Sequence, residues 1–137
     1  MAETIRKVDY YYFTVPDKAG EGARVLGALR DAGVNLLAVH AFPSARRCQI
    51  DVVPADAVAF LSAAKTAGLK VSKPKTAFLI EGDDRAGAVA NLHARLGAAG
   101  INITATTGVR SGAGRYGALL WVKPRDVKKA AETLGAM

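Results

Sequence analysis

Two sets of residues in this sequence combine an aspartate, a glycine and an asparagine at the same spacing. The first set is Asp17, Gly20 and Asn35, and the second is Asp84, Gly87 and Asn102. An aspartate attracts an ammonium group, an asparagine side chain both donates and accepts hydrogen bonds, and a glycine lets a ligand approach the backbone. A glycine in the first turn of a helix would also lie among free amide hydrogens that attract a carboxylate. This combination suits a small zwitterion.

The two sets belong to an internal repeat. The stretch PDKAGEGARVLGALRDAGVN (residues 16–35) and the stretch DDRAGAVANLHARLGAAGIN (residues 83–102) align without a gap. Aspartate, alanine, glycine, leucine and asparagine recur at matching positions, and the substitutions between them are mild. The chain therefore contains two copies of one module. Each copy must supply the helices and strands that position its own aspartate, glycine and asparagine.

Each copy predicts a strand, a helix and a hairpin in that order. The strands are expected at 10–15 and 76–82, where short aromatic and β-branched runs end at turn residues. The helices follow at once, with Asp17 and Asp84 predicted as N-caps and with Gly33 and Gly100 predicted to end them. Hairpins are expected over 34–53 and 101–122, because apolar runs flank the polar turns PSARR and RSGAGR.

A second helix is predicted after each hairpin, within 53–68 and 123–136, and the segment LKVSK (69–73) is predicted as a fourth strand of the first copy. The resulting order is β-α-β-β-α-β, an α+β fold of two ferredoxin-like modules in tandem, at residues 1–73 and 74–137. The second copy ends where its last strand should begin. We expect Glu3–Val8, or a strand of a neighbouring chain, to fill the open edge beside its first strand.

The turns DKAG and DRAG, each followed by an amphipathic helix and by GVNL or GINI, resemble the signature of the ACT domain. Ala19 and Ala86 depart from this signature, since the family usually has proline there. The resemblance covers nearly the whole chain and implies a stand-alone regulatory protein that binds an amino acid or similar small effector between modules. It implies a homodimer or higher oligomer and a regulated enzyme as a possible partner.

The residues implied in ligand binding lie at equivalent points of the two copies. They are Asp17, Ala19, Gly20, Asn35 and Leu36 in the first copy and Asp84, Ala86, Gly87, Asn102 and Ile103 in the second. Each type also has a purely structural role open to it: the aspartates as helix caps, the glycines for close packing and the asparagines as braces of a turn. His93 is expected to be half-buried and hydrogen-bonded on its helix.

Composition limits the other functions. The sequence has a net charge of +7, but its basic residues are scattered, which favours solvated faces over a groove for nucleic acid. Cys48 and His40 have no partners at metal-ligand spacing, so neither a metal nor a cofactor is expected. No phosphate loop or nucleophile motif occurs, and we expect a protein that is not an enzyme. Without an apolar stretch of membrane-spanning length, a cytoplasmic protein with no membrane partner is expected.

Two alternatives stay open at this stage. In the first, the chain keeps the fold without a pocket and acts only as an oligomerisation or interaction module, which Ala19, Ala86 and the missing last strand would favour. In the second, the chain binds nucleic acid, although residues 48–53 and 117–122 lack the basic and aromatic pattern of a common RNA-binding sheet.

Overall fold

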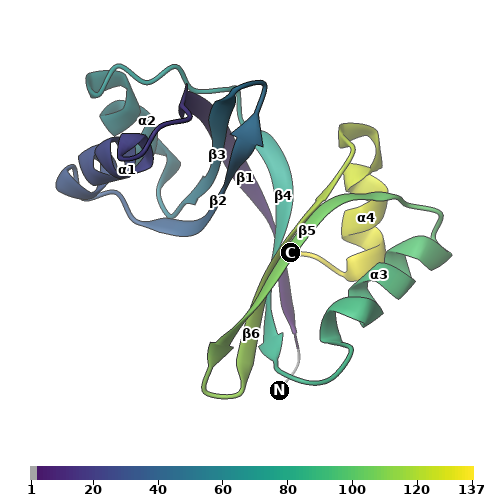
Figure 1. Ribbon diagram of the computed structural model, residues 1–137. Helices are drawn as coiled ribbons and strands as arrows, with labels where there is room; N and C mark the ends of the chain where they lie inside the picture. Colours follow the sequence, from purple (N-terminus) through teal and green to yellow (C-terminus); the bar gives the residue numbers. More distant parts are fainter. Residues whose placement is uncertain (1–2) are drawn as a thin grey trace. The chain divides into compact units, whose positions relative to one another are not determined.

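The computed structural model describes residues 3–137 and divides the chain into two compact units (Figure 1). The N-terminal unit is Asp9–Lys75. The C-terminal unit is Thr76–Met137 together with the N-terminal residues up to Val8. Each unit is α+β, with two helices against one face of an antiparallel sheet, as the order of elements predicts.

The N-terminal unit has the strand order β2-β3-β1 and a core between the sheet and its two helices. Alternate residues of β1, Tyr11, Phe13 and Val15, are buried in this core with Phe60 of the second helix. The elements are β1 (Thr4–Pro16), α1 (Glu21–Asp31), β2 (Leu36–Ser44), β3 (Arg47–Pro54) and α2 (Ala57–Thr66).

The C-terminal unit has the order β1-β4-β6-β5, in which β1 contributes its N-terminal residues. Phe78, Ile80 and Leu120 of the central strands pack against Leu92 and Leu96 of α3. The elements are β4 (Lys75–Asp83), α3 (Ala88–Ala98), β5 (Ile103–Gly112), β6 (Arg115–Val122), a 3-10 turn (Pro124–Asp126) and α4 (Val127–Leu134).

The duplication extends to the register of the hairpins. Gly108 pairs with Ala118 in one hairpin, and Ala41 pairs with Ile50 at the matching point of the other. Both hairpins also carry a bulge near the start of the first strand, between Leu36 and Ala38 and between Ile103 and Ala105. Residues of the two copies can therefore be compared position by position.

The helix ends match the prediction, but the helix starts do not. Gly33 (φ 77°) and Gly100 (φ 75°) follow α1 and α3 in the left-handed conformation that ends a helix. The N-caps, however, are Gly20 and Gly87, and no side chain caps either helix. The prediction that Asp17 and Asp84 cap the helices is wrong, because a left-handed glycine turn separates each aspartate from the first helical residue.

The open edge of the C-terminal unit is filled by the chain's own N-terminal segment. Strand β1 lies beside β4, Ile5 is buried in the core of this unit, and the Lys7 amide donates to the Met137 carbonyl at 3.1 Å. This is the first of the two occupants that the sequence predicts. As a consequence, the residues up to Val8 group with the second module and not with the predicted range 1–73.

The predicted fourth strand of the first copy does not form. Residues 69–74 have no strand assignment, although the Ser72 amide donates to the Tyr12 carbonyl at 2.9 Å. The Tyr12 amide in turn donates to the Ser72 side-chain oxygen at 3.0 Å. The Ser72 side chain thus replaces a backbone carbonyl as the acceptor for the Tyr12 amide. This interrupts the β-ladder that residues 69–73 would otherwise form with β1.

If the N-terminal segment completes the second module, a core truncation within it must weaken that module. We expect Ile5→Ala to lower the free energy of unfolding by about 2–4 kcal/mol, because it leaves a cavity in a packed core. Lys7→Ala, on the same strand but exposed, should change it by less than about 0.5 kcal/mol. Urea denaturation of both variants checks this, and equal losses would contradict the assignment.

Candidate ligand-binding site

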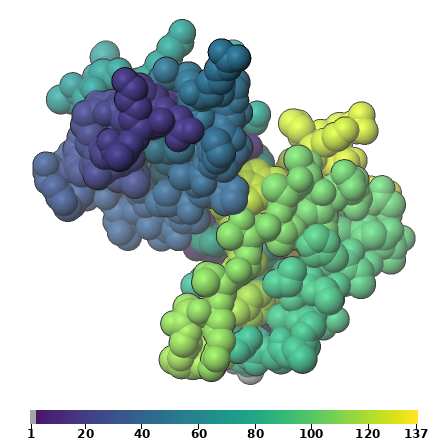
Figure 2. All heavy atoms as spheres, in the orientation of Figure 1, coloured from purple at the N-terminus to yellow at the C-terminus, as the bar shows by residue number. Residues whose placement is uncertain are grey.

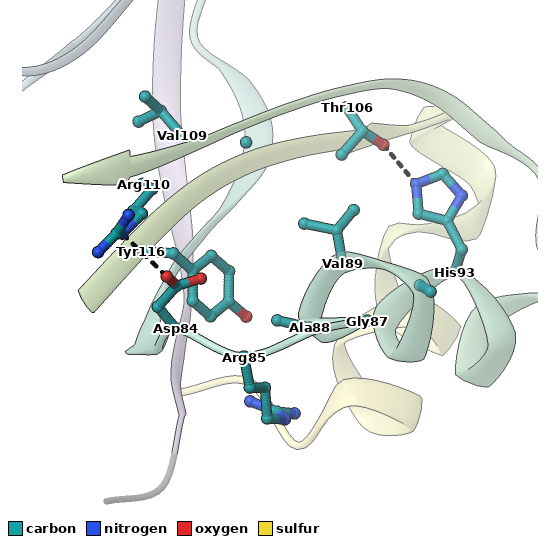
Figure 3. Close-up of a pocket in the computed structure, with 12 residues that line it drawn as sticks. Asp84, Arg85, Gly87, Ala88, Val89, His93, Thr106, Val109, Arg110 and Tyr116 are labelled. Carbon is teal, nitrogen blue, oxygen red and sulfur yellow. Dashed lines mark hydrogen bonds and ion pairs between the residues drawn. The ribbon is translucent and has the colours of Figure 1, made fainter. Parts of the chain in front are cut away.

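A hollow of about 470 Å³ lies in the C-terminal unit between the start of α3 and the face of β5 (Figure 3). It is open to solvent. In Figure 2 the tip of the β5–β6 hairpin (yellow-green) and the turn before α3 (teal) lie at the same end of this unit. The lining residues are Asp84, Arg85, Gly87, Ala88, Val89, Ala90, His93, Thr106, Gly108, Val109, Arg110 and Tyr116.

The floor of this pocket is the first turn of α3. Gly87 is left-handed (φ 79°), and no side chain caps the helix, so the amides of Val89 and Ala90 have no acceptor within it. Such amides point along the positive end of the helix dipole and favour an anion. The pocket therefore contains a surface that is suited to a carboxylate.

Two polar pairs stand at opposite ends of the pocket. Asp84 and Arg110 form an ion pair, with Oδ2 and Nε 3.0 Å apart, and His93 Nε2 is hydrogen-bonded to Thr106 Oγ1 at 3.0 Å. Figure 3 shows the Val89 side chain between the two pairs, directed toward β5. The pocket thus has an ionic end, an apolar middle and a second polar end.

Gly108 keeps the apolar middle open. A Cβ atom built on Gly108 would lie 3.2 Å from Cγ2 of Val89, which is closer than ordinary van der Waals contact. The first copy has Ala41 at this position. At the position of Val89 the first copy has Gly22, so the glycine of this contact lies on the strand in the second copy and on the helix in the first.

Tyr116 closes the inner side of the pocket. Its side chain is buried, and its hydroxyl donates to the carboxylate of Glu3, the residue before β1. Burial, together with the hydrogen bond and the negative charge of Glu3, raises the pKa of Tyr116 to about 12. The hydroxyl is therefore a fixed donor at neutral pH, and it ties a pocket residue to the N-terminal strand.

Of the residues predicted to bind ligand, the structure brings Asp84 and Gly87 to this pocket. Ala86 lies in the turn between them but does not line the pocket. Asn102, which is exposed, and Ile103 lie at the start of β5, away from its lining. In the first copy, Asp17, Ala19 and Gly20 occupy the turn before α1, and Asn35 and Leu36 occupy the start of β2.

Several lining residues were missed or misjudged from the sequence. His93 is hydrogen-bonded as expected, but it is exposed and not half-buried, because it lies beside the buried stripe of α3. Thr106, Gly108 and Arg110 were not singled out at all. The signal that could have found them is divergence between the copies, since the first copy has Val39, Ala41 and Pro43 at these positions.

Two further features are lacking in the part of the chain that the structure describes. Within residues 3–137, no three His, Cys, Asp or Glu side chains are grouped so that they could hold a metal ion. No helix in that range has the length and apolar character needed to cross a membrane.

The Asp84–Arg110 pair is exposed, so it should contribute little to the fold. We expect Arg110→Gln to change the free energy of unfolding by less than about 1 kcal/mol, because solvent screens such pairs. Urea denaturation measures this change. A larger loss would make the pair a structural element and remove it from the candidate site.

Known proteins resemble this chain in fold, but none matches it in sequence. No protein-family model matches the chain, and no curated protein matches it in sequence. A solved protein from Bacteroides thetaiotaomicron matches with a TM-score of 0.80 and 19% identity, over 97% of this chain and 88% of that chain.

The regulatory subunits of aspartate kinase from Thermus thermophilus and Thermus flavus match with TM-scores of 0.66 and 0.65. Their identities to this chain are 15% and 17%, over 98% of this chain and 96% and 94% of theirs. At these identities the likeness concerns the fold. The predicted α+β fold of two ACT-like modules in tandem is confirmed.

Proposed function

We propose that this chain is a regulatory protein that binds one small zwitterion, an amino acid or a similar molecule, in the pocket of its C-terminal unit. The observation that carries this proposal is the uncapped first turn of α3 facing the Asp84–Arg110 pair. A carboxylate would accept from the amides of Val89 and Ala90 and from Arg110. An ammonium group would lie against Asp84.

The paired charges at the ionic end favour a zwitterion over a simple anion or cation. Asp84 and Arg110 lie on opposite walls, one on the turn before α3 and one on β5. A zwitterion that enters between them gives each charge a new partner of opposite sign. A simple acid or amine would satisfy one of the two and leave the other without a partner, which costs free energy.

The other end of the pocket would then meet the ligand's side chain. The apolar stem can pack on Val89 and Ala88, and a polar end can reach the hydrogen-bonded pair His93 and Thr106. A small or medium side chain with one polar group at its end fits an apolar surface that is followed by a polar one. His93 and Thr106 thus become the residues that select among amino acids.

The first copy lacks most of the polar groups that line the pocket of the second copy. We therefore expect each chain to bind one ligand. Its turn keeps Asp17 and Gly20, but Leu26, Val39 and Pro43 replace His93, Thr106 and Arg110. Those side chains offer neither a cation for a carboxylate nor a polar end for a side chain. The first copy therefore keeps the module's fold without the polar groups of the second.

Regulation is supported by the fold, since the similar solved structures include two regulatory subunits of an enzyme. Strand β5, which contributes to the lining of the pocket, is the edge strand of the C-terminal unit. A second copy of the chain or a regulated enzyme that docks at this edge would cover a bound ligand. Assembly as a homodimer or higher oligomer is therefore part of the proposal.

Calorimetric titration of the full chain with each of the twenty L-amino acids tests the function. We expect at least one to bind, with one site per chain. Gly108→Val should abolish this binding, because its methyl groups would occupy the space beside Val89. A β-branched residue suits a strand, and the new Cβ requires Val89 to shift by only a few tenths of an ångström, so we expect the fold to persist, which urea denaturation checks.

Ala41→Val is the matched control, because it introduces the same side chain at the equivalent point of the first copy. It should bind as the unmodified chain does. Failure of every amino acid to bind would leave the fold as an interaction module. Loss of binding in Ala41→Val but not in Gly108→Val would place the site in the other copy.

A further inference from the structure

Two residues that line the pocket also contact a residue outside it. Tyr116 of β6 donates its hydroxyl to Oε2 of Glu3, and Nη2 of Arg85, on the turn before α3, lies 3.7 Å from the same oxygen. On its other side, Oε1 of Glu3 lies 3.9 Å from Nη1 of Arg95. One carboxylate at the N-terminal end of β1 thus connects two walls of the pocket.

Gly82 provides the space for this arrangement. A Cβ atom on Gly82 would lie 2.9 Å from Cε1 of Tyr116 and 2.9 Å from Cγ of Glu3, so any larger residue would displace one of them. The first copy, at the positions that match Gly82 and Tyr116, has Val15 and Cys48. The first module therefore folds without this contact, which is particular to the copy that contains the pocket.

The strand that follows Glu3 is held in the C-terminal unit by its pairing with β4 and by contacts with the core and the chain's last residue. Ile5 is buried, and the backbone of Ile5 and Lys7 exchanges hydrogen bonds with Met137. Beyond Val8 the same strand continues into the N-terminal unit, where Tyr11–Pro16 pair with β3. A change in how Glu3 is seated acts on a strand that belongs to both units.

We propose that Glu3 is a positioning residue for the pocket, and that ligand binding and the anchoring of the N-terminal end of β1 are thermodynamically coupled. This inference rests on the proposed function. With Glu3 in place, the Tyr116 ring is held against the pocket and Arg85 is held beside the first turn of α3. Coupling of this kind is reciprocal, so the bound ligand must stabilise the seated strand as much as the strand favours the ligand.

The coupling also gives the N-terminal end of β1 a regulatory role. If the N-terminal end of β1 detached from the sheet together with Glu3, Tyr116 and Arg85 would lose their contacts with the Glu3 carboxylate. Ligand binding would then weaken. In the other direction, a ligand would reduce the opening of this strand end. The state of the pocket would then be reported along β1 to the N-terminal unit.

The test compares Glu3→Gln with Lys7→Gln, a matched neutralisation of an exposed charge on β1. The probe is the L-amino acid that gives the largest binding heat in the screen described above. We expect Glu3→Gln to weaken binding about 5-fold or more, the lower end of measured coupling effects, and Lys7→Gln to leave it unchanged. The effects of Glu3→Gln and Tyr116→Phe should be less than additive in the double variant.

Amide hydrogen exchange supplies a readout that a merely structural residue would not move. Saturating amino acid should slow exchange of the amides of Ile5–Val8 in the unmodified chain and in Lys7→Gln, but not in Glu3→Gln. If the ligand binds and these amides are unaffected in every variant, or if Glu3→Gln binds as tightly as Lys7→Gln, the coupling is refuted while the proposed function stands. If no amino acid binds the unmodified chain, both are refuted together.

Discussion

A β-α-β-β-α module whose last strand is missing has a sheet edge with unpaired backbone groups, and this constraint governs the chain's C-terminal half. The N-terminal residues of β1 meet it by lying beside β4. Burial of Ile5 and the backbone hydrogen bonds to Met137 hold them there. Because one strand serves both units, the second module is completed only by residues that precede the first. The same strand brings Glu3 to the inner wall of the pocket.

Duplication of the module preserved its framework and not its chemistry. The two hairpins share the bulge near the start of the first strand and their register from there to Pro43 and Arg110, and α1 and α3 both end at a left-handed glycine. Around the pocket, however, His93, Thr106 and Arg110 stand where the first copy has Leu26, Val39 and Pro43. Residues that a fold requires stay alike in both copies, whereas residues that bind a ligand need to be present in only one. Divergence within the repeat therefore locates the candidate site better than similarity does.

The sequence predicted the fold because the relevant signals are local. The glycines Gly33 and Gly100 end their helices through backbone conformation alone, and the alternating buried residues of β1 and β4 follow from strand geometry. The N-caps were wrong because Asp17 and Asp84 have the preferred residue type, but the turn that follows them places Gly20 and Gly87 at the cap. The prediction of a fourth strand in the first copy was wrong, because the Ser72 side chain, and not a backbone carbonyl, accepts the hydrogen bond from the Tyr12 amide.

The site was predicted only in part, since its walls come from segments far apart in the chain. Asp84 and Gly87 belong to a recognisable turn, but Thr106 and Gly108 are ordinary strand residues until β5 is laid against α3. The most direct test of the account is a crystal structure of the chain grown with the amino acid that it binds. The account predicts ligand density against the first turn of α3, with its carboxylate on the amides of Val89 and Ala90 and on Arg110. Density at the start of α1 instead, with the pocket beside α3 empty, would contradict it.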